Sequence, residues 1–459
     1  MESNVLLRLP GSFRDPAGSI YISGDRVFRT VSQTAAPQYE TAREVLRSLV
    51  AQGRLADFEE RPVDGFEDAA YLLEHPKISP WTLPYEWSFS LLKEAALFHL
   101  DLHLYLLERG FTLSDASAYN VQFIGPRPVF IDHLSIRPYV EGEFWAGHRQ
   151  FCEQFLNPLL LRAYFDIAAN GWYRGELEGI PTAAIAKLLP LRSRLSWRAM
   201  THVILPAYFQ QGATSDREVN AALKNRKLPL EGFRGLLRQL FRWIEALRPA
   251  NISATTWANY ASTTTYDPAE AAQKGTFVGE FIAETRPRTV IDLGCNTGDY
   301  SSIALERGAD TVIGFDFDQQ SLDQAFQRAK AGNLNFLPLF LDARNPSPSQ
   351  GWMQSERLGF SERYSSDAVL ALAFEHHLAI AHNVPLDQVV EWIVSLAPTG
   401  VIEFVPKSDP TITKMLAFRE DIFPNYNEAH FRATLEKRSH TVRQKRISRS
   451  GRTLFWYSR

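Results

Sequence analysis

The feature that most constrains the fold of this chain is a hydrophobic run at residues 289–293 that leads into a loop of small residues. The run carries an acid, Asp292, and a helical pattern follows the loop. A second hydrophobic run at 311–315 then ends on Asp316. A buried strand, a tight turn and an acid at the tip of the next strand are typical of a parallel α/β sheet that binds an adenosine-bearing ligand. The small residues of the loop are Gly294, Cys295, Asn296, Thr297 and Gly298.

The spacing within this turn argues against a dinucleotide. A dinucleotide-binding turn reads G-x-G-x-x-G and directs helix amides at a pyrophosphate. Here the order is D-x-G-x-N-x-G, from Asp292 to Gly298, which puts a carboxylate where a diphosphate would be repelled. The pattern favours a ligand with cationic groups near the turn. It resembles motif I of the class I methyltransferases that depend on S-adenosylmethionine (SAM).

The second half of the chain alternates expected strands and helices, which predicts a Rossmann-like, doubly wound, mostly parallel sheet. The parallel strands are expected at 288–293, 311–315, 335–340, 366–373 and 400–405. Two further strands, 441–447 and 452–457, are joined by a short polar turn that contains Gly451 and predict a terminal antiparallel hairpin. This combination resembles the methyltransferase architecture rather than that of a dehydrogenase.

Ligands of open α/β sheets bind beyond the carboxyl ends of the strands. Asp292 would face the amino group of SAM. Asp316 is placed for both ribose hydroxyls, since a carboxylate accepts two hydrogen bonds, and Asp318 is the fallback. Asp342, after the third strand, resembles the residue that meets the adenine amino group. The alternative for each acid is that it caps the following helix. The predicted SAM-binding residues are Asp292, Gly294, Asn296, Gly298, Asp316 and Asp342.

The fourth expected strand ends in Glu375-His376-His377, where the transferred methyl group would lie. Methyl transfer is an in-line displacement, so most of the acceleration comes from alignment. An acceptor hydroxyl or ring nitrogen also needs a base, and histidine suits neutral pH. We assign the base to His376 or His377 and expect Glu375 to orient the base or the substrate. The alternative is that one histidine packs internally or caps the helix that begins at Leu378. A metal site that adds His382 lacks a recognised ligand spacing.

Two short segments around this site carry a further resemblance. Residues 374–380 read F-E-H-H-L-A-I, and residues 403–406 read E-F-V-P. They resemble a methyltransferase subgroup associated with rhizobial nodulation. The resemblance implies a bacterial protein that acts on a small molecule or a glycolipid.

The first half of the chain holds a second constellation, Asp115, Asn120 and Asp132. It resembles the catalytic and metal-binding loops of protein kinases and aminoglycoside phosphotransferases, and a helix expected at 89–108 fits the helix that carries this loop. The resemblance implies a mainly helical, kinase-like α+β domain. In it Asp115 would be the base toward an acceptor hydroxyl, and Asn120 and Asp132 would hold Mg²⁺ if the domain is active.

The phosphate site departs from that pattern. No lysine lies on an early strand, so Arg26 or Arg29, on a hairpin-like stretch at 19–31, is the only substitute, and the glycines there are too sparse for a phosphate loop. We therefore favour a degenerate kinase-like domain that binds substrate or partner over an active phosphotransferase. A helical accessory domain whose Asp and Asn side chains cap turns is the third alternative.

The length of 459 residues suits two or three domains, and helical patterns are interrupted around 249–265. We expect a kinase-like or helical accessory domain over 1–250 and a SAM-dependent methyltransferase domain over 262–459. The accessory domain would aid acceptor or partner recognition. Two alternatives remain: a bifunctional protein with an active N-terminal phosphotransferase, and a non-catalytic SAM-binding sensor or scaffold.

The composition limits the expected binding partners and the expected cellular compartment. A net charge of -3 and a pI near 6.4 give no general attraction to nucleic acid. The two cysteines, Cys152 and Cys295, exclude a disulfide framework and fit a reducing compartment. No apolar run reaches the length of a membrane span. We therefore expect a cytoplasmic protein.

Overall fold

The computed structural model describes residues 6–212, 227–250, 268–417 and 420–459. The chain divides into two compact units. Unit 1 is Met1–Asn251 together with Ser349–Arg357, and unit 2 is Ile252–Pro348 together with Leu358–Arg459. The boundary expected around 249–265 lies mostly outside the described residues. Among these residues, each helix is too short or too polar to cross a bilayer.

Unit 2 is built on a seven-stranded sheet in the order β12-β11-β10-β13-β14-β16-β15. Its first five strands in sequence pair in parallel, β16 is antiparallel to β14, and β15 is antiparallel to β16. The predicted mixed sheet with its terminal hairpin is therefore confirmed. The strands are β10 (Thr289–Leu293), β11 (Thr311–Asp316), β12 (Phe336–Phe340), β13 (Ala368–Ala371), β14 (Thr399–Phe404), β15 (His440–Arg446) and β16 (Thr453–Ser458).

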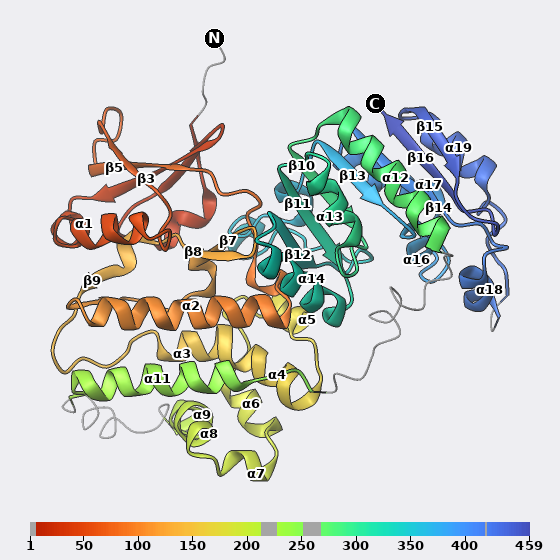
Figure 1. The fold of residues 1–459 in the computed structure, drawn as a ribbon. Coiled ribbons are helices and arrows are strands. Elements are labelled where there is room, and N and C mark those ends of the chain that lie inside the picture. The colour runs from red at the N-terminus through yellow and green to blue at the C-terminus, as the bar shows by residue number, and fades with distance from the viewer. Residues whose placement is uncertain (1–5, 213–226, 251–267, 418–419) are drawn as a thin grey trace. The chain divides into compact units, whose positions relative to one another are not determined.

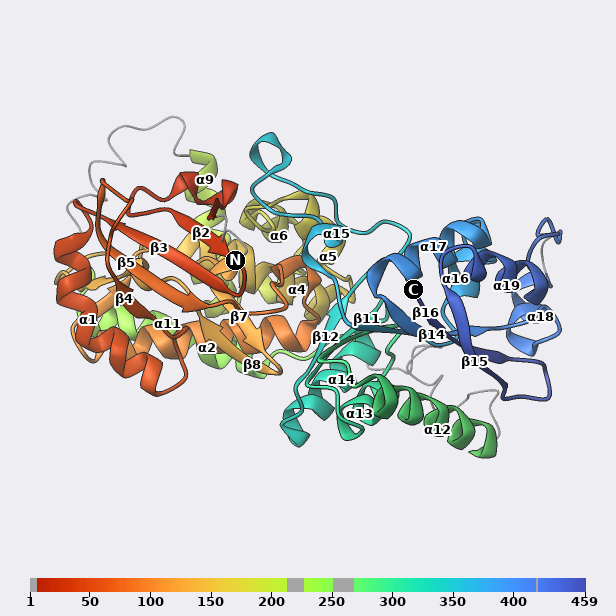
Figure 2. The same ribbon diagram turned by 90° about the horizontal axis from the view of Figure 1, so that it is seen from above.

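Helices cover both faces of this sheet, as the edge-on view shows (Figure 2). On one face, apolar side chains such as Phe281 and Leu322 pack on Val290 and Val312 of the central strands. That face is covered by α12 (Pro268–Thr285), α13 (Asp299–Glu306) and α14 (Gln319–Gly332). The elements of the other face and its rim are α15 (Phe360–Arg363), α16 (Glu375–Ala379), α17 (Leu386–Leu396), α18 (Pro410–Leu416) and α19 (Glu428–Glu436). The short helix η7 (Trp352–Gln354) belongs to unit 1.

Unit 1 begins with a five-stranded antiparallel sheet in the order β1-β2-β3-β5-β4. The hairpin-like stretch expected at 19–31 is the β2–β3 pair. Helix α1 follows β3 and packs against it (Figure 1). These elements are β1 (Leu7–Arg8), η1 (Pro10–Arg14), β2 (Ile20–Ser23), β3 (Arg26–Ser32), α1 (Ala36–Ala51), β4 (Glu59–Arg61) and β5 (Ala69–Pro76).

The rest of unit 1 is mainly helical. Helix α2 (Phe89–Leu107) is capped by Ser88, whose side chain accepts a hydrogen bond from the Leu91 amide, and it lies along α11 (Leu230–Ala246) (Figure 1). Two short antiparallel pairs, β6–β9 and β7–β8, follow α2. The smaller elements are η2 (Pro84–Glu86), β6 (Phe111–Leu113), η3 (Ala118–Asn120), β7 (Val121–Ile124), β8 (Arg127–Phe130), η4 (His133–Ser135), β9 (Ile136–Pro138), α3 (His148–Phe151), η5 (Cys152–Leu156), α4 (Asn157–Phe165), α5 (Asn170–Gly175), α6 (Thr182–Leu188), α7 (Leu191–Arg194), α8 (Trp197–Ala199), η6 (Met200–Ile204) and α9 (Leu205–Gly212).

The segment Ser349–Arg357 belongs to unit 1 although it comes between β12 and β13 in sequence. Within unit 1, the Gln350 side-chain amide donates to the Arg174 carbonyl over 2.9 Å. The Arg357 guanidinium lies 4.2 Å from the centre of the Tyr119 ring. The methyltransferase domain expected over 262–459 includes this segment, because nothing local in its sequence marks these distant partners.

Candidate functional site

The turn after β10 needs a left-handed backbone at three positions, and glycine and asparagine occupy them. Gly294, Asn296 and Gly298 all have positive φ angles, 72°, 49° and 82°. A Cβ atom at Gly298 would lie 2.4 Å from the Phe336 ring, so only glycine fits there. The Gly294 amide donates to the Phe315 carbonyl over 2.8 Å, which fastens the turn to the neighbouring strand.

The strand register brings the predicted residues to one edge of the sheet. Leu293 of β10 lies opposite Phe315 of β11 on one side and opposite Ala371 of β13 on the other. Asp316 therefore comes one position beyond this row, beside the turn. The residues that follow Ala371 lead into α16, which carries both predicted base candidates.

Asp316 holds the turn with its own carboxylate. Its Oδ2 accepts a hydrogen bond from the Asn296 amide over 2.8 Å, and its Oδ1 accepts one from the Asp318 amide over 2.9 Å. Burial raises the pKa of Asp316 to about 6. Asp318 accepts a hydrogen bond from the Ser321 amide over 2.7 Å and caps α14. Asp318, the second choice for the ribose hydroxyls, therefore serves as a helix cap.

Asp292 lies on β10 and is 2% exposed. Its Oδ2 accepts a hydrogen bond of 2.6 Å from the Ser301 hydroxyl of α13. Burial raises its pKa to about 6, against the lowering effects of Ser301 and the Lys274 charge. Asp292 is therefore a buried acid that one hydroxyl donor holds in place, near the Lys274 charge.

Asp342 differs from the other two acids because it is half-buried and already paired. The Arg344 guanidinium donates to both of its carboxylate oxygens, over 2.7 Å and 2.8 Å. Partial burial would raise its pKa, but the hydrogen bonds from Arg344 outweigh it, and the pKa of Asp342 is lowered. A ligand at this position would have to share the carboxylate with Arg344.

Glu375 is fully buried at the start of α16. Its Oε1 accepts hydrogen bonds from the Val405 amide, over 2.9 Å, and from the Tyr426 hydroxyl, over 3.0 Å. Its Oε2 lies 3.6 Å from Nδ1 of His376. The side chain therefore ties α16 to the end of β14 and also lies beside the first histidine.

The two histidines differ in exposure. His376 is fully buried, and neither of its ring nitrogens makes a hydrogen bond within the described part of the chain. His377 is half-buried, and the two ring centres are 4.1 Å apart. Burial, together with the charges of its neighbours, lowers the pKa of His377 well below its usual value. The imidazole of His377 is therefore neutral near pH 7, and as a base it is weaker than an exposed histidine.

A buried ionic network lies close to these residues, and sequence reasoning missed it. Lys274 of α12 lies 2.6 Å from Oε2 of Glu403 on β14, and both side chains are buried. Arg452 contacts the other Glu403 oxygen at 3.5 Å and Asp409 at 2.7 Å. The signal available in the sequence was Lys274 itself, a lysine among the apolar positions of the α12 helical pattern. The charges of Lys274 and Arg452 reach Asp292 and His377 respectively.

In unit 1 the second constellation is also brought together. The Asn120 amide nitrogen lies 3.2 Å from Oδ1 of Asp115 and 3.2 Å from Oδ2 of Asp132. Burial, followed by the charge of Asp132, raises the pKa of Asp115 to about 7. A carboxyl group with such a pKa is suited to proton transfer at neutral pH.

An arginine from the sheet completes this group. Arg29 of β3 donates to Oδ1 of Asp132 over 2.7 Å and to Oδ2 of Asp15 over 3.0 Å. Arg26 instead pairs with Glu74 at 3.2 Å. Of the two arginines that the sequence offered, Arg29 therefore reaches the acidic group.

The described residues hold one group of three His, Cys, Asp or Glu side chains close enough to share a metal ion, His148, Cys152 and His202 in unit 1. Sequence reasoning missed this group because its members are separated along the chain. Within the described residues, Glu375, His376, His377 and His382, which lack a recognised ligand spacing in the sequence, do not form such a cluster.

No protein-family model matches this chain. Among solved structures, the N-methyltransferase NodS from Bradyrhizobium japonicum WM9, in complex with S-adenosyl-L-homocysteine, covers 43% of this chain and 90% of its own, with 10% identity and a TM-score of 0.33. The magnesium protoporphyrin IX methyltransferase from Synechocystis PCC 6803, also with bound S-adenosyl-L-homocysteine (SAH), covers 41% of this chain and 84% of its own, with 19% identity and a TM-score of 0.30.

A curated relative matches over almost the full length. The nodulation protein NoeA of Rhizobium meliloti (strain 1021) is 53% identical over 457 residues, which is 98% of this chain and 96% of that protein. The match spans both units. The chain therefore belongs to the family of the nodulation protein NoeA.

Proposed function

We propose that this protein is a SAM-dependent methyltransferase that transfers a methyl group to an oxygen or nitrogen atom of a small molecule or a glycolipid. One observation carries the proposal: Asp292, the turn at 294–298 and Asp316 meet at one edge of the sheet, and the neighbouring strand β13 leads at that edge into α16, which carries His377. The relative NoeA is named a nodulation protein, which supports an acceptor that is made or used during nodulation.

The donor set at this edge fits SAM. Asp292 would attract the amino group, because it is a buried acid near the turn. Asp316 has lone pairs beyond those that accept from the two backbone amides, and these could accept from ribose hydroxyls. The positive φ at Gly294 suits glycine, and a Cβ atom there would lie 3.2 Å from the Phe374 ring. Asp342 is the remaining candidate for the adenine amino group. When bound, SAM supplies an activated methyl group on a sulfonium.

The chain's own residues would then align the acceptor and manage its proton. His377 would take a proton from the acceptor hydroxyl or amine, since its imidazole is neutral at pH 7. Glu375 would hold α16 in place through Val405 and Tyr426, so that His377 keeps its position. His376, buried between them, would support the ring of His377 by contact.

Calorimetry with SAM on the full-length protein is the direct test, with NAD as the competing ligand class. We expect SAM to bind with one site per chain and NAD to give no heat. Binding of NAD but not SAM would overturn the proposal. If SAM binds, radiolabelled SAM supplied with a lysate of the source organism would identify the acceptor. Tight SAM binding with no transfer to any molecule in that lysate would instead support a sensor or scaffold.

A second function for unit 1 is favoured by the Asp115–Asn120–Asp132 group. An acid with a pKa of about 7 beside an amide and a second acid supports a phosphotransferase-like site, in which Asn120 and Asp132 would hold Mg²⁺ and Asp115 would accept a proton. Arg29 would take the place of the lysine that usually pairs with nucleotide phosphates. The departures of the phosphate site from the kinase pattern still favour a degenerate domain, in which the same group binds a substrate or partner without turnover.

A further inference from the structure

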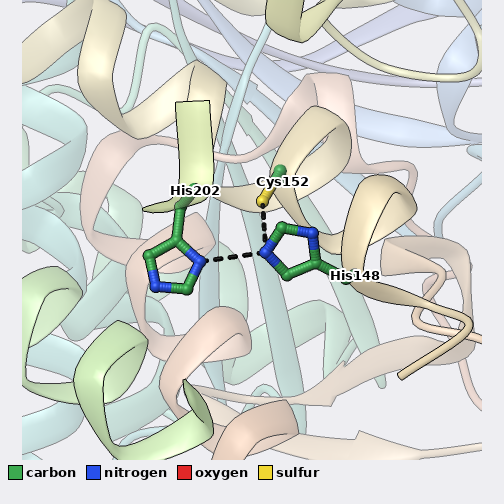
Figure 3. Close-up of side chains that lie close together, drawn as sticks. All are labelled: His148, Cys152 and His202. Carbon is green, nitrogen blue, oxygen red and sulfur yellow. Dashed lines mark hydrogen bonds between the residues drawn. The ribbon is translucent and has the colours of Figure 1, made fainter. Parts of the chain in front are cut away.

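Three side chains of unit 1 converge on a small volume inside the helical region (Figure 3). Nε2 of His148 lies 2.9 Å from Nδ1 of His202 and 3.7 Å from Sγ of Cys152. All three candidate ligand atoms lie within 4.8 Å of one another. His148 is half-buried, and the other two side chains are buried.

The backbone on both sides of this cluster is unusual. Cys152 is the first residue of η5 (Cys152–Leu156), and His202 is in the middle of η6 (Met200–Ile204). Both segments are π-helical turns inserted between α-helical turns. Such turns are rare and are frequently found at functional sites, because the wider turn re-aims a side chain. Here two of them, separated by about fifty residues of chain, direct their side chains at the same point.

A hydrogen bond from outside the cluster fixes the ring of His202. Its Nε2 lies 2.8 Å from Oε1 of Gln239 on α11. An amide oxygen only accepts, so Nε2 must carry the proton, and Nδ1 presents a lone pair toward His148. Metal-binding histidines are commonly oriented in this way, with the second ring nitrogen donating to an acceptor.

Two of the three ligand separations are close to those around a tetrahedral ion. Zn–N distances of about 2.0–2.1 Å and a Zn–S distance of about 2.3 Å place N and S ligands roughly 3.6 Å apart and two N ligands roughly 3.3 Å apart. The observed 3.7 Å between His148 and Cys152 already matches. The 2.9 Å between the two histidines is a hydrogen-bond distance and would need to widen by a few tenths of an ångström.

Aromatic side chains surround the cluster. The Trp145 ring lies 5.5 Å from the His148 ring, and the Trp243 ring lies 6.3 Å from the His202 ring, centre to centre. An apolar surrounding limits water access and strengthens the bonds between an ion and its ligands.

We propose that His148, Cys152 and His202 bind a divalent ion that prefers nitrogen and sulfur ligands, with Zn²⁺ as the best match. A thiolate and two imidazoles are the ligand types that this ion takes, and hard ions such as Mg²⁺ and Ca²⁺ require oxygen. Three protein ligands leave a fourth position for water. On binding, the Cys152 thiol loses its proton to solvent, and the proton on Nε2 of His148 moves to Nδ1 of the same ring. The ion would fasten α3 and η5 to η6.

Cobalt provides a direct test, because Co²⁺ occupies such sites and a cobalt–thiolate bond absorbs in the near ultraviolet. The full-length protein, freed of metal with a chelator, would be titrated with Co²⁺ and then with Zn²⁺. We expect one equivalent of Co²⁺ to produce the thiolate band and Zn²⁺ to abolish it. Wild-type protein that gives no thiolate band would overturn the proposal without any variant.

Variants then identify the ligands. Cys152→Ser should lose the band, whereas Cys295→Ser, which changes the other buried cysteine, should keep it. Gln239→Leu should keep the band but weaken Co²⁺ binding by roughly 10- to 100-fold, as expected when a group that orients a ligand is removed. A band that persists in Cys152→Ser would also overturn the proposal. Should Cys152→Ser fail to fold, the wild-type and Gln239→Leu titrations still decide the question.

Discussion

The carboxylate of Asp316 accepts a hydrogen bond from the backbone amide of Asn296 over 2.8 Å. The acid at the end of β11 thus holds the turn that follows β10. A single side chain both shapes the candidate SAM site and lines it, so its loss should affect the ligand in two ways.

Asp316→Asn should weaken SAM binding by about 10- to 100-fold, because hydrogen bonds to a charged group are worth about 1.5–3 kcal/mol. Calorimetry would measure the change. Asp310→Asn is the matched control, because Asp310 is exposed and precedes the opposite end of the same strand. Equal affinities for wild type and Asp316→Asn would remove Asp316 from the site.

The affinity for SAM should rise with pH between about pH 5 and pH 7. Asp292 and Asp316 both have pKa values raised to about 6 by burial, so they are protonated below that pH and attract a cation less. Calorimetry at several pH values would measure this. Asp292→Asn, which can still accept from Ser301, should show a flatter profile, and an unchanged profile would contradict the role of Asp292.

The same shift has a consequence for stability without ligand. A carboxyl group whose folded pKa is about 6 and whose ordinary value is 3.8 binds more protons when folded, so its contribution to stability falls as pH rises through that window. The melting temperature of Asp292→Asn minus that of wild type should therefore increase as the pH rises from 4 to 7. A difference that stays constant with pH would count against a buried, titrating Asp292.

His377→Ala should lower the rate of methyl transfer by about 10²- to 10⁴-fold, the usual worth of a general base, while leaving SAM affinity intact. Incorporation of labelled methyl groups in a lysate would measure it. His376→Ala should instead act mainly on melting temperature, since His376 is fully buried. His440→Ala, on the exposed strand β15, is the control. Equal, negligible losses for both neighbours would reduce the pair to packing.

Lys274→Met should destabilise unit 2 by about 3–5 kcal/mol, because it leaves the Glu403 charge buried with a weaker partner. Urea unfolding would measure the loss. Lys437→Met, at the exposed end of α19, should stay within about 0.5 kcal/mol of wild type. A harmless Lys274→Met would show that Arg452 alone compensates Glu403.

In unit 1, Asp132→Ala should abolish any Mg²⁺-dependent binding or turnover of ATP, whereas Asp68→Ala, at an exposed loop position, should leave it unchanged. Fluorescence titration with a labelled nucleotide, with and without Mg²⁺, would measure this. Wild-type protein that binds no nucleotide under either condition would remove the phosphotransferase alternative.

The sheet of unit 2 could be predicted because its signals are local. Strands β10, β11 and β12 are short, mostly apolar runs with an acid at or just after the end, and the Gly294 and Gly298 turn needs backbone angles that glycine provides. Much of the candidate site follows, since parallel strands bring their carboxyl ends to one edge.

The rest depends on partners that are far away in sequence. Nothing near Glu375 indicates that Tyr426 donates to it, and nothing near His148 indicates His202. The pairing of Asp342 with Arg344 is local, but sequence alone leaves open whether the arginine turns toward the acid or toward a ligand. The acids could therefore be located from sequence, whereas their hydrogen-bond partners could not.

The segment Ser349–Arg357 leaves one folded body, joins the other and returns. Suppose that the gene were split at the junction between the two halves. The N-terminal product would then lack the contact of Arg357 with Tyr119, and the C-terminal product would carry a loop without its partners in unit 1. Such an arrangement disfavours the shuffling of either half as a separate cassette during evolution. We expect the two halves to have been inherited together.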